Sequence, residues 1–270
     1  MPLIVVPTPV GNLKDMTLRG LCVLREADVI ACEDTRHTLQ LLNHYEIKKP
    51  LISCHEHNEA ERSKELSELV AQGKNVALVS DAGMPGLSDP GGKVVKYMLE
   101  RGLPVDVLPG ANALLPALLL SGIDMERFTF VGFLKGKTSE KKAQLLELSK
   151  IKHTLVFYIA PHKLLQELEL LGAVLGDRNA SLVREISKIH QETIRGTLNS
   201  FKDTVPEEKI RGEFVCVVEG HKEQESLDAE WREQVQKLAD AGESVKNIVK
   251  LIAEKYGVPK NSVKQLAMKR

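Results

Sequence analysis

The segment from Val79 to Gly91 restricts the fold more than any other part of the chain, because it can continue neither as a strand nor as a helix. It reads Val-Ser-Asp-Ala-Gly-Met-Pro-Gly-Leu-Ser-Asp-Pro-Gly, with three glycines and two prolines behind an apolar run. Residues 75–79 predict a buried strand, and the apolar spacing over residues 94–98 predicts a helix that begins near Gly92. The segment is therefore a loop between a strand end and a helix start, where open α/β sheets bind ligands.

The same order of strand, loop and helix recurs along the first half of the chain. Short apolar runs predict strands at 3–6, 29–32, 51–53, 75–79 and 104–108. Helical spacing predicts helices over 18–26, through 39–42, through 66–70, from 92 onward and over 114–120. Strands that alternate with helices indicate a parallel sheet with right-handed crossovers. The almost wholly apolar helix at 114–120 is expected to be buried against that sheet.

The second half places strands next to one another, which indicates a partly antiparallel sheet. Strands are predicted at 128–133, 153–159, 180–185, 192–196 and 213–219, and helices at 140–150, 162–171 and 198–204. After a charged linker, the chain predicts three short helices that resemble a helix-turn-helix unit, the last of them opened by Ser262. We therefore predict two α/β domains, at 1–134 and 135–222, and a helical module at 229–270.

The net charge of the chain limits the kinds of binding partner that it can attract. The 270 residues carry no formal net charge, so no protein-wide field attracts a polyanion or an anionic membrane. Any nucleic-acid binding must come from local patches, of which there are two. One is Lys135, Lys137, Lys141 and Lys142. The other lies between 241 and 270, where seven basic residues against two acidic ones give a net charge of +5.

Cysteine and histidine spacing favours packing over metal binding. The four cysteines show no CxxC spacing, which suits reduced thiols in a cytoplasmic protein. The apolar run after Met1 stops at Pro7 without a basic leader, and no stretch has the length of a membrane span. His37, His55 and His57 are expected to be surface or packing residues, because HEHNE gives HxH without further clustered ligands, and no metal is expected.

Three loops are expected to converge at one edge of the parallel sheet: 7–15, 80–91 and 109–113. Their glycines and prolines let backbone amides and carbonyls approach a ligand closely. The chain has no GxxxxGK[ST], and the first loop lacks GxGxxG, so the spacing does not favour a phosphate-donor cofactor. A cofactor with hydroxyls, an amine and a cationic centre suits Asp81, Ser88, Asp89 and Asn112.

Five ordered motifs carry a resemblance that covers nearly the whole chain. They are PTPVGNL at 7–13, ACEDTRHT at 31–38, SDAGMPGLSDPG at 80–91, LPGANA at 108–113 and REISKIHQE at 184–192. This set resembles the tetrapyrrole methylase superfamily, and within it the branch that methylates RNA of the small ribosomal subunit. One motif departs from the tetrapyrrole-modifying members, which carry a GxGPGD-like first loop where this chain has PTPVGN.

The resemblance implies a fold, a cofactor and a reaction. It implies S-adenosylmethionine in a cleft between two α/β domains, a homodimer, and methyl transfer to the 2′-hydroxyl of a cytidine in the decoding region of 16S ribosomal RNA, within the small subunit. It places the cofactor against the three loops, at Pro9, Asp81, Gly83, Pro85, Ser88, Asp89, Ala111 and Asn112. Two other readings stay open: a methylase of a small tetrapyrrole, and a non-catalytic RNA-binding or assembly factor.

Methyl transfer to a ribose hydroxyl requires in-line placement of the reacting atoms and a way to remove a proton from a poor acid. Orientation can supply roughly 7 to 11 kcal/mol, whereas a base gives roughly 10² to 10⁴-fold in rate, so positioning should dominate. We expect Asp34 or Glu33, or Glu185 with Lys188, to handle the proton and the RNA backbone. For Glu33 and Asp34, capping of the following helix is an equal alternative. Arg184, Lys188 and His190 share one face only if their segment is extended.

Overall fold

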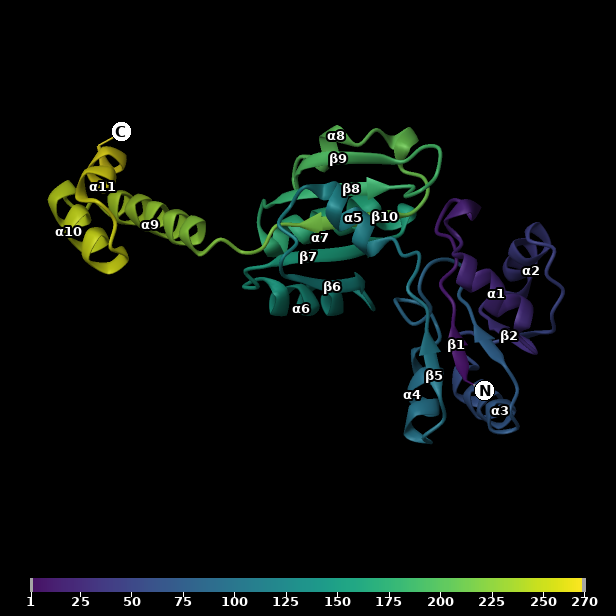
Figure 1. Cartoon of the computed structure of the whole chain (residues 1–270). Helices are drawn as coiled ribbons and strands as arrows, with labels where there is room; N and C mark the ends of the chain where they lie inside the picture. The colour runs from purple at the N-terminus through teal and green to yellow at the C-terminus, as the bar shows by residue number, and fades with distance from the viewer. Residues whose placement is uncertain (1, 269–270) are drawn as a thin grey trace. The chain divides into compact units, whose positions relative to one another are not determined.

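The structure, a computed structural model, describes residues 2–268, and for Glu207 and residues 223–229 it describes the backbone alone. The described chain separates into two compact units (Figure 1). Residues up to 149 together with 153–219 form the first unit, which we call the α/β body. Residues 150–152 and the chain from 220 onward form the second, which we call the C-terminal module.

The first sheet of the α/β body is parallel throughout, as the alternation of strands and helices predicts. Its strand order is β3-β2-β4-β1-β5. The strands are β1 Leu3–Val5, β2 Val29–Cys32, β3 Leu51–Ser53, β4 Val76–Leu78 and β5 Val105–Val107. The central strand β4 is buried over its whole length between β2 and β1. Because all the strands run the same way, their carboxyl ends share one edge of the sheet.

Helices cover both faces of this sheet (Figure 1). They are α1 Leu18–Glu26, α2 Thr35–His44, α3 Glu59–Ala71 and α4 Gly92–Glu100. Leu66 of α3 and Met98 of α4 pack on one face, against side chains such as Val5. Leu24 of α1 and Leu42 of α2 pack on the other face. The two apolar layers bury the inner strands β2 and β4 over their whole length, which explains why these strands read as continuous apolar runs, whereas the edge strands β3 and β5 are only partly buried.

The second sheet is mixed, with the order β6-β7-β10-β8-β9. Its strands are β6 Phe128–Phe133, β7 Thr154–Ile159, β8 Asn179–Arg184, β9 Glu192–Thr197 and β10 Phe214–Val218. Only β6 and β7 pair in parallel, and the other neighbours are antiparallel. The predicted boundary between 134 and 135 falls after β6, which pairs with β7 in this second sheet. The domain limits themselves stay predictions.

The apolar helix α5 (Leu114–Ser121) packs against the second sheet, so the expected burial against the parallel sheet is wrong. Leu114, Ala117 and Leu118 lie against Val156 of β7 and Val183 of β8. Both faces of the parallel sheet are already covered by α1 to α4, whereas this face of the second sheet needs a cover. Figure 1 shows α6 (Thr138–Leu148), α7 (Leu164–Leu175) and α8 (Phe201–Thr204) alongside the same sheet.

The C-terminal module consists of α9 (Glu223–Asp240), α10 (Val245–Tyr256) and α11 (Lys260–Ala267). Its core holds Trp231, Val235, Ile248, Ile252, Val263 and Ala267. Ser262 lies inside α11, which begins directly after Pro259, so the predicted start at Ser262 is wrong by two residues. Lys269 and Arg270 of the predicted basic tail lie outside the described residues. Within residues 2–268 every helix is too short or too polar to cross a bilayer.

Candidate active site

Hydrogen bonds tie together the loops that follow β1, β2 and β4. Thr8 and Gly83 exchange backbone hydrogen bonds of 2.9 and 2.8 Å, and the Thr8 hydroxyl donates to the Ser80 carbonyl at 3.1 Å. The backbone N–H of Asp34 donates to Oδ1 of Asp81 at 3.1 Å. Of the three loops predicted to converge, 7–15 and 80–91 are therefore joined by hydrogen bonds, the third approaches Gly83 with its backbone at 111–112, and the segment after β2 adds a contact to Asp81.

The loop 80–91 turns back on itself through backbone conformations in the left-handed region. Gly83 has φ +80°, which glycine adopts without steric cost, and its close neighbours are Val10 and the backbone at 111–112. Ser88 has φ +69°, which costs a residue with a Cβ atom some free energy. The amide of Gly86 donates to the Pro90 carbonyl at 3.0 Å and closes the turn. This shape aims Ser88 and Asp89 toward the second sheet.

A cavity of about 420 Å³ lies beside this loop, a volume typical of small-molecule sites. Both sheets contribute to its walls. The loops of the first sheet supply Val10, Glu33, Asp81, Ala82, Gly83, Met84, Leu87, Ser88, Asp89, Asn112 and Ala113. The second sheet supplies Phe133, Tyr158, Ile159, Ala160, Pro161, His162, Glu213, Phe214 and Val215.

The cavity is acidic. Its lining holds the carboxylates of Glu33, Asp81, Asp89 and Glu213, and among the described lining residues there is no lysine or arginine. Burial, together with the charges of Glu33, Asp81 and Glu213, raises the pKa of Asp89 to about 7, against the opposing effect of a hydrogen bond from Ser80. Burial, followed by the charge of Asp81, also raises the pKa of Glu33. Such a site favours a ligand that brings positive charge.

Five of the predicted cofactor residues line this cavity: Asp81, Gly83, Ser88, Asp89 and Asn112. The other three, Pro9, Pro85 and Ala111, belong to the same loops without lining the cavity among the described residues. Asn112 also organises its loop, since its side-chain oxygen accepts from the Leu115 amide at 2.9 Å.

Glu33 and Asp34 differ in their surroundings although they are adjacent. The Asp34 carboxylate accepts from the Arg36 amide at 2.8 Å, caps α2 and pairs with the Arg36 guanidinium at 2.7 Å. Its hydrogen bonds with Arg36 hold the pKa of Asp34 well below its usual range. Glu33 lines the cavity and has a raised pKa. Asp34 therefore caps α2, as the alternative to a catalytic role predicts, whereas Glu33 lines the cavity.

The segment 185–191 is a turn, so the face that Arg184, Lys188 and His190 would share on an extended strand does not form. Glu185 and Ser187 have φ +52° and +66°. Lys188 pairs with Glu185 at 2.9 Å and Arg184 with Glu192 at 3.0 Å. These ion pairs hold the turn at the end of β8.

This turn lies against the first loop of the chain. The Ser187 hydroxyl donates to the Asp15 carboxylate. A Cβ atom added to Gly11 would come within 2.5 Å of the Ile186 carbonyl oxygen and of Cγ of Lys188. Glu185 and Lys188 therefore belong to a junction between loop 7–15 and the turn. They are absent from the lining of the cavity among the described residues.

The sequence analysis missed the wall that the second sheet supplies. Tyr158 lies near the end of β7, where Phe130 and Phe133 pack edge-on against its ring at centroid distances of 5.0 and 5.5 Å. Burial raises the pKa of Tyr158 to about 12. Glu213 directly precedes β10. The sequence signal for this wall is the run of aromatic and polar residues at strand ends of the second half.

The histidines near the site do not form a metal centre. His55 and His57 contact each other edge-on at 6.0 Å between ring centroids. No three histidine, cysteine, aspartate or glutamate side chains within the described part of the chain gather in an arrangement that could hold a metal ion.

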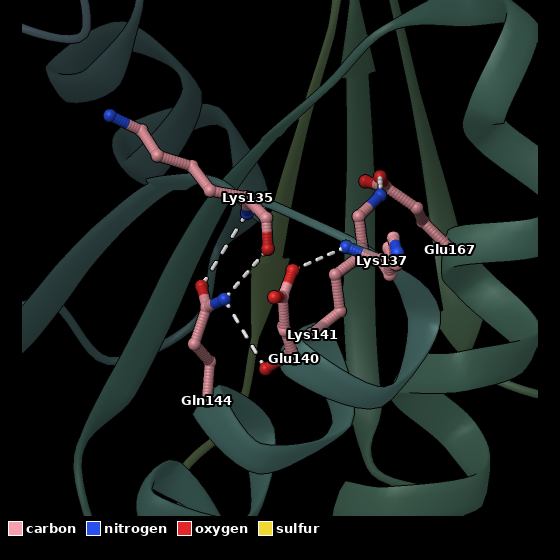
Figure 2. A network of polar contacts seen from close by, with 6 residues as sticks. All are labelled: Lys135, Lys137, Glu140, Lys141, Gln144 and Glu167. Carbon is pink, nitrogen blue, oxygen red and sulfur yellow. Dashed lines mark hydrogen bonds and ion pairs between the residues drawn. The ribbon is translucent and has the colours of Figure 1, made fainter.

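The basic stretch 135–142 is partly neutralised within the fold (Figure 2). Lys141 pairs with Glu167 of α7, and the side chains of both are largely buried. Glu140 accepts from the Lys137 amide at 2.7 Å, and the Gln144 amide donates to the Lys135 carbonyl at 2.8 Å. The side chain of Lys135 extends away from this network in Figure 2. Lys141 therefore stabilises α6 against α7 and is not available to a phosphate, whereas Lys135, Lys137 and Lys142 are exposed.

Comparison with known proteins adds relatives of nearly full length. A family model described as Tetrapyrrole (Corrin/Porphyrin) Methylases matches residues 2–202. A protein of Bacillus subtilis named ribosomal RNA small subunit methyltransferase I is 44% identical over 268 residues, which are 97% of this chain and 92% of that protein. The protein of the same name from Halalkalibacterium halodurans is 41% identical over 267 residues, 97% of this chain and 92% of that protein.

A third relative is shorter. The protein of the same name from Thermotoga maritima is 44% identical over 219 residues, which are 81% of this chain and 98% of that protein. Its length therefore matches that of the α/β body alone.

Solved structures share the fold at low sequence identity. Uroporphyrin-III C-methyl transferase from Thermus thermophilus, complexed with S-adenosyl homocysteine, superposes with a TM-score of 0.56 at 20% identity, over 81% of this chain and 97% of that chain. Diphthine synthase gives a TM-score of 0.62 at 17% identity, over 82% of this chain and 92% of that chain.

Proposed function

We propose that this chain, which belongs to the tetrapyrrole methylase family and is a methyltransferase, uses S-adenosylmethionine to methylate the 2′-hydroxyl of a cytidine in the decoding region of 16S ribosomal RNA. One observation carries the proposal: relatives named ribosomal RNA small subunit methyltransferase I are 38 to 44% identical to this chain over most of its length. The first loop supports RNA over a tetrapyrrole, because it reads PTPVGN where tetrapyrrole-modifying members carry a GxGPGD-like sequence.

The chemistry of the cavity fits this cofactor. S-adenosylmethionine, when bound, would supply a methyl group activated by a positively charged sulfur. The four carboxylates of the cavity face no lysine or arginine among the described lining residues, so a cationic ligand relieves their mutual repulsion. Apolar side chains such as Leu87 and Phe133 offer surface to a flat base, and a solved structure that shares this fold, Uroporphyrin-III C-methyl transferase, is complexed with S-adenyl homocysteine.

Positioning is the larger part of the proposed mechanism. Rigid loops from both sheets hold the cofactor, and the acceptor ribose is placed by the protein in line with the methyl group. Glu33 is the carboxylate we assign to the hydroxyl proton, because it lines the cavity and its pKa is raised. Asp34 is a weaker base, since Arg36 lowers its pKa. Glu185 and Lys188 shape the neighbouring turn, where the RNA backbone would pass.

The RNA is proposed to meet two exposed basic surfaces. One is Lys135, Lys137 and Lys142 at the start of α6, without the buried Lys141. The other is the part of the C-terminal module from residue 241 onward, where five described lysines are exposed: Lys246, Lys250, Lys255, Lys260 and Lys264. Exposed lysines contact phosphates and release counterions, which gives binding that depends on salt.

The homodimer that the family resemblance implies stays a proposal with one supporting observation. Leu115 and Leu119 are 49% and 69% exposed on α5, opposite the face that packs on the second sheet. Two large apolar side chains one helical turn apart suit a contact with a second copy. Sedimentation of the purified protein measures this directly.

The deciding experiment maps ribose methyl groups of 16S RNA by mass spectrometry in cells with and without the gene, followed by assay of the purified protein on small subunits and on naked RNA. We expect one cytidine 2′-O-methyl group in the decoding region to disappear without the protein and to be restored by it. An unchanged methyl map contradicts the proposal. Methylation of a porphyrinoid in the same assay favours the tetrapyrrole reading, and absence of cofactor binding by calorimetry favours a non-catalytic RNA-binding factor.

A further inference from the structure

We infer that Glu59 is a positioning residue for the cofactor loop. Its buried carboxylate holds the end of the loop that carries Ser88 and Asp89 and thereby sets the shape of the cavity wall. The functional part of the inference rests on the proposed function, because it takes that wall to be the cofactor site. Glu59 belongs to the HEHNE segment at 55–59, which the proposed chemistry leaves without a role.

Glu59 reaches the loop from the first residue of α3. The residue is 3% exposed, which is rare for a glutamate. Its Oε1 accepts hydrogen bonds from the Gly91 amide at 2.8 Å and the Lys93 amide at 3.0 Å. The Lys93 ammonium lies 3.5 Å from Oε2 on the solvent side. One carboxylate therefore serves two backbone donors 32 and 34 residues further along the chain.

These two amides belong to a helix start that lacks a cap of its own. Helix α4 begins at Gly92, and its N-cap residue Gly91 has no side chain that could accept a hydrogen bond. The first amides of a helix have no partner within the helix, and a negative charge there is favourable. Glu59 supplies both the missing acceptor and the charge from another helix. A glycine is tolerated at the N-cap of α4 because the carboxylate of Glu59, at the start of α3, accepts the hydrogen bonds that a capping side chain would otherwise accept.

The position of Gly91 decides the position of Asp89. Gly91 has φ +123°, in the region that is open to glycine, whereas Ser88 has φ +69°, which a residue with a Cβ atom rarely adopts. The Thr8–Gly83 hydrogen bonds fix the other end of the loop. Between these two anchors, Ser88 lies so close to β6 that a Cβ atom on Gly132 would come within 2.8 Å of the Ser88 hydroxyl oxygen. Release of the Gly91 end frees Ser88 and Asp89 to leave the cavity wall.

The neighbouring Asn58 fixes Glu59 itself. Its side-chain oxygen accepts from the His55 amide at 2.8 Å, and its side-chain nitrogen donates to the Ser53 carbonyl at 3.1 Å. Asn58 thus ties the start of α3 to the end of β3, next to the strand end that carries Glu33. The Asn58–Glu59 pair therefore connects the end of β3 to the Gly91 end of the loop 80–91.

The test compares variants that keep or remove the Oε1 acceptor. Glu59→Gln keeps an oxygen that can accept both amides, whereas Glu59→Ala removes it. Glu167→Ala is the matched control, because Glu167 is also a nearly buried carboxylate paired with a lysine but lies outside the cavity. Lys93→Ala removes only the exposed ion pair. Two quantities are measured on the whole protein: hydrogen exchange of amides 86–93 without any ligand, and the Kd for S-adenosylmethionine by calorimetry.

We expect Glu59→Ala to speed exchange at residues 91–93 and to weaken cofactor binding by about tenfold or more, since hydrogen bonds to a buried charged group are among the stronger ones. Glu59→Gln and Lys93→Ala should stay within about threefold of the unaltered protein, as should Glu167→Ala despite its lower melting temperature. Should Glu59→Ala not fold, Glu59→Asp replaces it. That variant withdraws the carboxylate by one methylene and should weaken binding while Glu59→Gln does not.

Equal exchange and equal affinity in Glu59→Ala would overturn the inference, and so would an equal loss of affinity in Glu167→Ala. Failure of the proposed function has a different signature. If the unaltered protein does not bind S-adenosylmethionine, the cofactor proposal fails, whereas hydrogen exchange at residues 91–93 still decides whether Glu59 holds the loop.

Discussion

At the scale of single residues, the main feature of the site is a set of four carboxylates that the fold places in the lining of one cavity. Asp89 is withdrawn from water and faces Glu33, Asp81 and Glu213, so its proton is held up to a pH of about 7. Such perturbed groups cluster at functional sites, and binding of a cation would offset the unfavourable burial of these neighbouring carboxylates. The same residues would be unremarkable carboxylates in an extended chain.

The first prediction concerns the pH dependence of stability. The pKa of Asp89 is about 7 in the folded protein against 3.8 ordinarily, so the folded state holds an extra proton between these values and stability falls as pH rises through that window. Asp89→Asn removes this loss. The free energy of unfolding of the variant minus that of the unaltered protein should therefore increase from pH 4 to pH 8. We expect this increase to be about 1 kcal/mol, because the carboxyl is partly solvated. Urea unfolding at both pH values measures the difference, and parallel pH profiles would contradict the shifted pKa.

The second prediction separates Glu33 from Asp34. Glu33→Gln removes the proposed proton acceptor and should slow single-turnover methylation by roughly 10² to 10⁴-fold. Asp34→Asn keeps a side chain that caps helices equally well, so its rate should be nearly normal. The reverse order of the two effects would move the base to Asp34. Alanine at Glu185 or Lys188 with a normal rate would remove those residues from the mechanism.

At the scale of elements, two loops far apart in the sequence come into contact only because one position has no side chain. Gly11 lies against the backbone of residue 186 and the side chain of Lys188, at distances that no Cβ atom tolerates. The contact joins the first loop of the parallel sheet to the turn that follows β8. The conformation of Gly11 is ordinary, so close approach is the reason for the glycine.

The third prediction tests this junction. Gly11→Ala should push the turn 185–191 away from loop 7–15 and lower the methylation rate by about tenfold or more, since small displacements of positioning groups are costly. Gly92→Ala is the control, because a Cβ atom there meets nothing within 4 Å. Its rate should be unchanged. An active Gly11→Ala protein would show that the junction is dispensable.

At the scale of the whole molecule, the chain consists of the α/β body, to which we assign the chemistry, and the C-terminal module. The Thermotoga maritima relative matches 81% of this chain and is almost fully covered by that match, so a protein of its family exists at about the length of the α/β body. The module has its own apolar core, from Trp231 to Ala267, and five exposed lysines between residues 246 and 264. This division suits a module that adds affinity for RNA to a body that performs the chemistry.

The fourth prediction follows from that division. Removal of residues 226–270 should leave the cofactor Kd unchanged, because the residues of the cavity all belong to the α/β body. Affinity for the small subunit at low salt should fall by about tenfold or more, and the slope of log K against log salt should become shallower by roughly 2 to 4, as each lost phosphate contact removes about 0.7 to 0.9. An unchanged salt slope would exclude the module from RNA binding.

Much of the fold was readable from the residues because it depends on local patterns. Apolar runs of three to six residues and helical spacing placed the strands and most helices within a few positions, and the five motifs pointed to the family that the comparisons show. The helix 114–120 was placed on the wrong sheet because an apolar surface all round specifies burial without specifying a partner. Choice of partner depends on which face is still uncovered.

The site, too, has features that follow from the local sequence and features that depend on tertiary contacts. The sequence by itself determined that the loop 79–91 follows a buried strand, cannot be regular and carries two aspartates, because glycine, proline and spacing act on the local chain. Only the tertiary structure decided that Tyr158 and Glu213 face this loop, that Asp34 caps a helix while Glu33 lines the cavity, and that Glu59 holds Gly91. The contacts join residues 32 or more positions apart, and Glu33 and Asp34 are adjacent residues that differ in orientation, so no local periodicity encodes these features.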